Sequence, residues 1–302
     1  MRLVSFGPPR AERPGVMVGE DAVLPLGGVL EEFGLPAGDM NAVLGTLPLI
    51  RPAIEARIDA GDEVVPLAGQ RLGPPVPRPQ KILVIGGNYH SHVLEASALN
   101  KGKPPTLPII VLKPSTNVIG PYDDIVRPLE TSKLDYEAEL MVVIGRGGRR
   151  IPRERAYEHV AGYMNGDDTG AREIMMGDVE DSPLHTQPTR GKGYDTFCPT
   201  GPWLVTRDEV PDPMDLRIRK WVNGELRQDD STSDMIVDVP GLVADASNVM
   251  RLVPGDMLLT GTPAGCGGLR NPPVYLQPGD VVRQEIEGLG VMENRVVDEP
   301  GR

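Results

Sequence analysis

The sequence predicts a β-rich α+β fold. Its 302 residues include 36 glycines and 32 prolines, which is above average usage and favours many turns and short strands over long helices. Apolar runs of strand length end in glycine or proline, such as residues 81–86 and 107–114. Residues 239–252 are the stretch most typical of a long helix.

The chain is expected to fold as two unequal parts. Residues 72–79 are rich in proline and cannot continue a helix or a central strand, so they are typical of an extended linker. We therefore predict a small N-terminal domain at residues 1–75 and a larger domain, which carries the candidate chemistry, at residues 76–302. In the small domain, residues 1–6 and 16–26 are typical of short strands, and residues 31–58 could form one or two helices.

Charge and cysteine content exclude several classes of protein. With 43 acidic and 31 basic residues the net charge is −12, which argues against nucleic acid or an anionic membrane as a partner. Cys198 and Cys266 form no CxxC motif, so neither a disulfide framework nor a thiolate zinc site is expected. The N-terminus lacks the apolar segment of a signal peptide, and no apolar run reaches the roughly 18 residues of a membrane span. We expect a cytoplasmic protein.

The larger part is organised around residues 134–145, which read as a strand that becomes apolar and ends in glycine. Side chains alternate faces along a strand, so Glu137 and Glu139 are expected to point the same way. Adjacent carboxylates repel each other, and a hard divalent cation such as Mg²⁺ between them would relieve that repulsion with oxygen ligands. The alternative is a half-exposed strand with two solvated glutamates.

A candidate acid–base pair follows the predicted strand at residues 81–86. The next residues turn into a helix on which His92 and Glu95 are three apart and share a face. A carboxylate beside an imidazole fixes its tautomer and raises its basicity, which suits general acid–base catalysis. The alternative is an ordinary His–Glu pair on the surface of a helix.

Three more charged residues stand at strand ends or in turns. Lys113 ends a predicted strand and could hold a substrate carboxylate, Asp168 could add a third carboxylate around a cation, and Lys192 stands between two glycines. Each has a structural alternative, because either lysine could be solvated and the aspartate could cap a helix that begins near Ala171.

The C-terminal third contains a predicted hairpin, a helix and a glycine-containing loop. Asn223 and Gly224 lie near the end of the strand pattern at residues 216–226 and indicate a hairpin turn. The strand at residues 257–259 leads into Thr260-Gly261-Thr262-Pro263, whose amides and hydroxyls could bind an oxyanion. The alternative is a tight structural turn.

Taken in order, these motifs resemble those of the fumarylacetoacetate hydrolase family. The resemblance covers residues 81 to about 300, whereas the first 75 residues match only the small N-terminal domain that many members carry. The motifs are Gly87-Asn88-Tyr89 with His92 and Glu95, Leu112-Lys113-Pro114, Asp135-Tyr136-Glu137-Ala138-Glu139-Leu140, Gly162-Tyr163 with Asp168 and Ala171-Arg172, Gly191-Lys192-Gly193-Tyr194-Asp195-Thr196-Phe197, Gly201-Pro202-Trp203, Pro254-Gly255-Asp256 and Thr260-Gly261-Thr262-Pro263.

The resemblance implies a catalytic domain with a mixed, barrel-like β-roll and a homodimeric assembly. It implies that Glu137, Glu139 and Asp168 bind Mg²⁺, Mn²⁺ or Ca²⁺. It implies that His92 and Glu95 activate water. Lys192 and Lys113 would stabilise the substrate enolate or its carboxylate. Further residues expected to contact the substrate are Tyr89, Arg172, Thr260, Gly261 and Thr262.

The sequence departs from the family pattern beside the expected metal aspartate. Asp167 stands where the family commonly has asparagine, and Gly170 stands where it commonly has serine. Met175 and Met176 lie where a glutamine is often found. These changes bear on the substrate more than on the metal, and the methionines indicate a more apolar pocket.

From these observations we predict a divalent-metal-dependent hydrolase of a small keto or diketo acid. It would cleave a carbon–carbon bond of a 1,3-dicarbonyl substrate, acylpyruvate-like or another diketo acid. The alternatives at the same site are decarboxylation, isomerisation or hydration of a related keto acid, and hydrolysis of a diketo sugar acid. A non-catalytic member that only binds a ligand is disfavoured, because the set of acids, histidine and lysines is complete.

Overall fold

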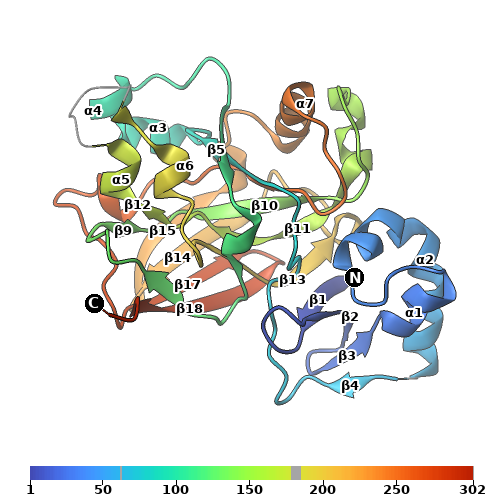
Figure 1. Ribbon diagram of the computed structural model, residues 1–302. Helices are drawn as coiled ribbons and strands as arrows, with labels where there is room; N and C mark the ends of the chain where they lie inside the picture. The colour runs from blue at the N-terminus through green and yellow to red at the C-terminus, as the bar shows by residue number, and fades with distance from the viewer. Residues whose placement is uncertain (62, 178–184, 302) are drawn as a thin grey trace.

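The computed structural model describes residues 1–61, 63–177 and 185–301, and it confirms the β-rich α+β fold (Figure 1). Within this part of the chain the strands form an 11-stranded sheet, a five-stranded sheet and a two-stranded pair. The helices are short apart from two, and none of the described helices is long and apolar enough to cross a membrane.

The larger sheet combines strands from the first 66 residues with strands from the rest of the chain. Its described strands are β1 (Arg2–Phe6), β2 (Arg13–Val18), β3 (Ala22–Pro25), β4 (Val65–Pro66), β5 (Ile82–Gly86), β6 (Ile109–Lys113), β7 (Val118–Ile119), β10 (Ala138–Ile144), β11 (Val160–Asp167), β13 (Cys198–Thr206) and β16 (Met257–Leu259). Their order is β4-β3-β2-β1-β13-β11-β10-β16-β5-β6, with β7 beside β13. The β10 strand is fully buried and lies between β11 and β16, so it is a central strand.

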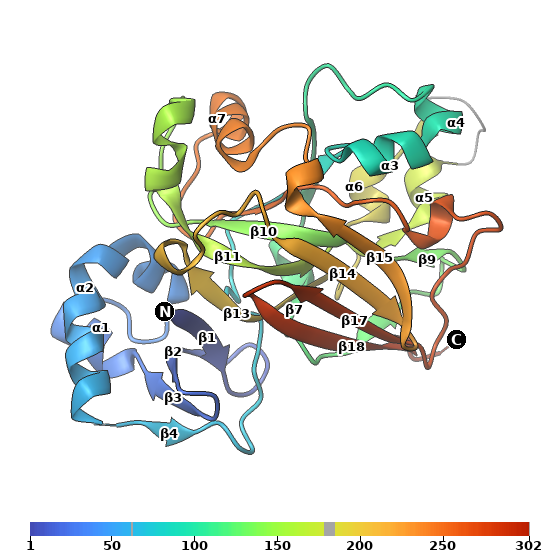
Figure 2. The same cartoon turned by 180° about the vertical axis from the view of Figure 1, so that it is seen from behind.

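The five-stranded sheet packs against the middle of the larger one. It contains β8 (Ile125–Arg127), β14 (Arg217–Val222), β15 (Glu225–Ser231), β17 (Val281–Ile286) and β18 (Gly290–Asp298). The hairpin predicted at Asn223 and Gly224 is confirmed, and both residues have a positive φ, as such turns require. Ile218 and Ile286 share a core with Leu140 of β10, so the two sheets form layers (Figure 2).

The strand predicted over residues 134–145 is interrupted. β9 (Leu134–Asp135) pairs with β12 (Gly170–Ala171), and β10 begins only at Ala138. Asp135 accepts hydrogen bonds from the N–H groups of Tyr136 and Gly267, while the N–H of Glu137 donates to Asp167 Oδ1 at 3.0 Å. These side-chain bonds replace ladder bonds, so Glu137 lies in a break between two strands rather than inside one.

The longest helix, α2 (Met40–Ala60), packs its buried side chains against residues of the larger sheet. The described helices are α1 (Gly27–Glu32), α2, α3 (His90–Glu95), α4 (Ser97–Asn100), α5 (Arg172–Met176), α6 (Pro188–Gly191) and α7 (Val239–Val249), with 3₁₀ turns η1 (Ser115–Asn117), η2 (Arg153–His159), η4 (Arg207–Glu209), η5 (Thr232–Asp234) and η6 (Gly267–Leu269). The helix predicted at residues 239–252 is confirmed as α7, and Asp238 caps it by accepting from Gly241 N at 2.9 Å.

The N-terminal strands and α2 continue into the rest of the molecule. β1 pairs with β13, and residues 1–60 occupy the blue region of Figure 1 beside it. One core cluster contains Leu44 and Ile50 of α2 together with Met141 and Leu259. Sheet and core therefore run across residue 75, and the division into two domains at that residue stays a prediction.

Candidate active site

Three carboxylates gather where β10 begins and β11 ends. Register pairing of Ala138 with Asp167 brings Glu137 next to Asp168, whose N–H donates to the Glu137 carbonyl at 2.9 Å. Carboxylate oxygens of Glu137, Glu139 and Asp168 lie within 4.8 Å of one another. These residues are only 6%, 1% and 1% exposed, so their charges are removed from bulk water.

Two buried lysines contact this cluster. Lys192 Nζ lies 2.9 Å from Glu137 Oε2 and also binds Asp168. Lys113 Nζ binds Asp168 as well and donates to the Thr169 carbonyl at 2.9 Å. The alternatives for these residues are therefore wrong, because the lysines are not solvated and Asp168 does not cap a helix. Ala171 is the N-cap of α5, without a side-chain hydrogen bond.

The pKa values of the two glutamates in the cluster are shifted in opposite directions. Burial, followed by the charge of Asp168, raises the pKa of Glu139 well above its ordinary value. Burial also opposes ionisation of Glu137, but Lys192 and Arg172 outweigh it and lower its pKa. Nearby cations thus compensate the charge of Glu137 better than that of Glu139. Three carboxylates offering only oxygen ligands fit a hard divalent cation, so the residues present suit the predicted metal.

Arg172 supports one side of the cluster. Its guanidinium binds Asp135 Oδ2, with Nε and Nη2 at 2.9 and 2.6 Å, and Nη2 also lies 2.9 Å from Glu137 Oε1. Asp135 in turn accepts from the N–H groups of Gly267 and Gly268 at 2.7 and 2.8 Å. Arg172 lines the central cavity, but its charge is already engaged with two carboxylates. Arg172 therefore orients Glu137, and the predicted contact with the substrate would be a second role.

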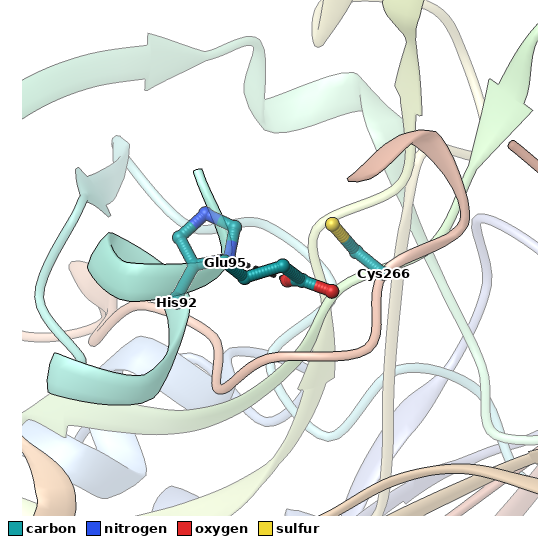
Figure 3. A group of neighbouring side chains, drawn as sticks. All are labelled: His92, Glu95 and Cys266. Carbon is teal, nitrogen blue, oxygen red and sulfur yellow. Dashed lines mark ion pairs between the residues drawn. The ribbon is translucent and has the colours of Figure 1, made fainter. Parts of the chain in front are cut away.

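The predicted acid–base pair lies on α3, beside the carboxylate cluster. His92 Nδ1 and Glu95 Oε2 are 3.5 Å apart, and Glu95 Oε1 accepts from Gly265 N at 2.9 Å. Figure 3 shows both side chains leaving the same helix, with Cys266 facing them from a loop. Tyr89 precedes this helix and is fully buried. The helix thus presents His92 to the cavity and anchors Glu95 to the loop after β16.

The loop after β16 supports the cluster from a third side. Gly261 has a φ of +100°, and its N–H donates to Glu139 Oε2 at 2.7 Å. Thr260 Oγ1 donates to the Leu140 carbonyl at 2.9 Å, so it holds β10 rather than facing the cavity. Of the three loop residues proposed to bind substrate, Thr262 lines the cavity.

All these elements surround one cavity of about 190 Å³. Its polar wall contains His92, Glu137, Glu139, Arg172, Lys192 and Thr262. Its apolar wall contains Val84, Ile85, Ile109, Val111, Met175 and Pro188. Lys113 and Asp168 do not line this cavity, but Asp168 pairs with Lys192, which does. The volume suits a small acid, and the two walls suit a molecule with one polar and one apolar end.

The five-stranded sheet contributes buried polar groups that sequence reasoning missed. Lys220 pairs with Asp167, Gln284 Nε2 donates to the Gly166 carbonyl at 3.0 Å, and Gln228 Oε1 accepts from Ala138 N at 2.9 Å. A signal was available, because Lys220 and Gln284 occupy inward positions in strands whose buried and exposed residues alternate. A polar side chain at such a position needs a buried partner.

Comparison with protein families agrees with this geometry. The profile described as "Fumarylacetoacetate (FAA) hydrolase C-terminal" matches residues 81–297. The chain belongs to the fumarylacetoacetate hydrolase family. The resemblance seen in the motifs is thereby confirmed, and the protein is a metal-dependent enzyme of this family.

Relatives within the family carry out different reactions. The chain is 38% identical to the mitochondrial oxaloacetate tautomerase FAHD2B of Bos taurus, over 98% of this chain and 92% of that protein. It is 37% identical to the solved structure of a probable 2-hydroxyhepta-2,4-diene-1,7-dioate isomerase from Mycobacterium abscessus, with a TM-score of 0.80 and 99% of both chains covered. Maleylpyruvate hydrolase from Sphingobium sp. SYK-6, in complex with manganese(II) and pyruvate, is 33% identical, with a TM-score of 0.79 and 99% of both chains covered.

Membership of the fumarylacetoacetate hydrolase family therefore establishes the fold and the kind of enzyme, while the reaction differs among relatives. The name of the bovine relative assigns that protein to mitochondria. The cytoplasmic location and the homodimer expected for this chain stay predictions.

Proposed function

We propose that this chain is a hydrolase that cleaves a carbon–carbon bond of a small acylpyruvate-like 1,3-dicarbonyl acid, with a divalent metal ion as cofactor. The observation that carries the proposal is that His92 lies on the same cavity as Glu137 and Glu139. A base with a carboxylate beside it thus faces a cluster of metal-type ligands across a space that fits a small acid.

Glu137, Glu139 and Asp168 are the residues that would hold Mg²⁺ or Mn²⁺. When bound there, a divalent ion would stabilise negative charge that develops on the oxygen of a 2-keto acid. Support comes from the related maleylpyruvate hydrolase, whose structure holds manganese(II) and pyruvate. Lys192 lies on the same wall of the cavity and adds a fixed positive charge that favours an enolate over a neutral ketone.

The dyad supplies the proton transfers. Glu95 is fixed by Gly265 N and lies beside the imidazole of His92, with its Oε2 3.5 Å from Nδ1. His92 removes a proton from water, which adds to the carbonyl farther from the substrate carboxylate. The carbon–carbon bond then breaks, its electron pair passes to the pyruvyl part as an enolate, and protonation of that enolate gives two acids. The apolar wall around Ile109 and Met175 would contact the acyl chain.

A second candidate is tautomerisation of an oxaloacetate-like acid. It is favoured by the 38% identity to the bovine oxaloacetate tautomerase over 98% of this chain. The same base would move a proton between carbon and oxygen without adding water. The cavity would then need to hold only the acid, without a water molecule that reacts with it.

Product analysis separates the two candidates. Purified protein is stripped of metal, supplied with Mg²⁺ or Mn²⁺, and incubated separately with acetylpyruvate and with oxaloacetate. Metal-dependent formation of acetate and pyruvate supports hydrolysis. Faster keto–enol exchange of oxaloacetate with acetylpyruvate untouched supports the tautomerase, and CO₂ release would indicate a decarboxylase.

A further inference from the structure

A second group of potential metal ligands adjoins the carboxylate cluster. His92 and Glu95 of α3 approach Cys266, which is the N-cap of η6 (Figure 3). One ligand atom from each of these three residues lies within 4.8 Å of the other two. The cluster contains a nitrogen, an oxygen and a sulfur ligand, whereas the carboxylate cluster offers only oxygens.

Two atoms of this group lack hydrogen bonds. His92 Nδ1 and Glu95 Oε2 are both buried and have no hydrogen-bond partner among the described residues. Their separation of 3.5 Å is long for a hydrogen bond. It is close to the spacing of about 3.3 Å between two tetrahedral zinc ligands with bonds of about 2.0–2.1 Å. A metal ion between them would therefore give both atoms the partner they lack.

The surroundings of Cys266 also suit a metal. Arg172 Nη2 lies 3.5 Å from Cys266 Sγ and would offset the charge of a metal-bound thiolate, whereas burial raises the pKa of Cys266 well above its ordinary value, so metal binding must displace the thiol proton. The N–H of Gly265, next to Cys266 in the chain, donates to Glu95 Oε1 at 2.9 Å, which holds the loop against α3. Because His92 lines the cavity, an ion can reach the group from that side. Thiolate and imidazole select Zn²⁺, whereas Mg²⁺ prefers oxygen ligands.

We propose that His92, Glu95 and Cys266 form a second metal site, which binds Zn²⁺ and inhibits the enzyme. On binding, the S–H bond of Cys266 breaks, its proton leaves to solvent, and a sulfur–zinc bond forms. The His92 nitrogen and the Glu95 carboxylate become ligands and no longer serve as base and support. The inhibition rests on the proposed function of this dyad, whereas the zinc binding does not.

The test must separate this site from the carboxylate cluster, because Zn²⁺ also binds carboxylate oxygens. Metal-free protein is first saturated with Mg²⁺ and then titrated with Zn²⁺ against a chromophoric zinc chelator. Co²⁺ is used in parallel as a spectroscopic substitute, since a sulfur-to-cobalt charge-transfer band appears only when a thiolate is bound. The variants are Cys266→Ser, His92→Ala and Glu139→Gln, with Cys198→Ser as the control for the other thiol.

We expect the wild-type protein to bind Zn²⁺ in the presence of Mg²⁺ and to show the charge-transfer band. Cys266→Ser should lose the band and bind zinc at least about tenfold more weakly, and His92→Ala should also weaken zinc binding. Glu139→Gln and Cys198→Ser should keep the band. Absence of the band in the wild type, or unchanged zinc affinity in Cys266→Ser, overturns the site.

Inhibition is measured on the same variants with whichever substrate is turned over. Zinc should inhibit the wild type at concentrations at least about tenfold below those that inhibit Cys266→Ser. Equal sensitivity would overturn the inhibitory role, because zinc would then act at the carboxylate cluster. Zinc binding through Cys266 in a protein that hydrolyses no dicarbonyl acid would uphold the site and refute the proposed hydrolase.

Discussion

Lys220 Nζ lies 2.5 Å from Asp167 Oδ2, and both side chains are fully buried. The pair stands directly behind the active site, because Asp167 Oδ1 accepts from Glu137 N at 3.0 Å. Lys220 also donates to Gln284 Oε1 at 3.1 Å. Burial raises the pKa of Asp167 and lowers that of Lys220, so desolvation opposes both charges of the pair. The pair therefore orients Glu137 at an energetic cost.

Removing one partner of this pair should be costly. Lys220→Met leaves the Asp167 carboxylate buried without a counter-charge, and we expect it to lower the free energy of unfolding by about 3–5 kcal/mol. Lys220→Met combined with Asp167→Asn should recover most of that loss, since asparagine can still accept from Glu137 N. Urea unfolding of wild type, single and double variants measures both effects. A double variant no more stable than Lys220→Met would show that the charge pair is not the cause.

The proposed base makes a separate prediction about turnover. His92→Ala should reduce kcat by roughly 10²- to 10⁴-fold, the range of general acid–base catalysis, while Mn²⁺ binding to the carboxylate cluster persists. His90→Ala is a matched control, because His90 lies on the same helix but is exposed to solvent. Steady-state kinetics and a Mn²⁺ binding isotherm are recorded for all three proteins. Undiminished kcat in His92→Ala would remove His92 from the reaction.

An ion pair on the surface links α2 to η4. Arg51 Nη1 and Nη2 donate to Asp208 Oδ2 and Oδ1 at 3.0 and 2.9 Å. Burial opposes ionisation of Asp208, but the Arg51 hydrogen bonds outweigh it and lower the pKa of Asp208 to about 2. A carboxylate with a lowered pKa stabilises the fold above its unfolded pKa of about 3.9 and loses that contribution as the pH falls toward 2.

Asp208→Asn should therefore be less stable than the wild type at pH 6, by less than about 1 kcal/mol because the pair is partly exposed. The difference should stay constant down to about pH 4 and shrink below it. Urea midpoints of both proteins between pH 6 and pH 3 measure this. A difference that grows as the pH falls would contradict the assignment of the lowered pKa to Asp208.

Much of the site could be predicted from local sequence. His92 and Glu95 are close because a helix places residues three apart on one face, and α3 does so. Glu137 and Glu139 were predicted to share one face of a continuous strand. They do lie together, but β9 and β10 are separate strands, and the Asp135 bonds to Gly267 and Gly268 that accompany this break come from residues more than 130 positions away.

The remaining parts depend on contacts that no local pattern encodes. From the sequence, Asp168 could equally have capped a helix. Only the folded chain brings Lys113 and Lys192 to its carboxylate. The Lys220–Asp167 pair joins strands of two different sheets. Residues 178–184, between α5 and α6, lie outside the described residues, and Met175 of α5 lines the cavity, as the apolar character of the methionines indicated.

The carboxylate cluster is the central claim, and a Mn²⁺ binding isotherm tests it most directly. Wild-type protein should bind one Mn²⁺ ion at this cluster, and Glu137→Ala should lose that binding because one of three oxygen donors is removed. Glu20→Ala is the control, since Glu20 is a surface acid that pairs with Arg2. We expect the control to bind as the wild type does. Unchanged Mn²⁺ affinity and stoichiometry in Glu137→Ala would contradict the account.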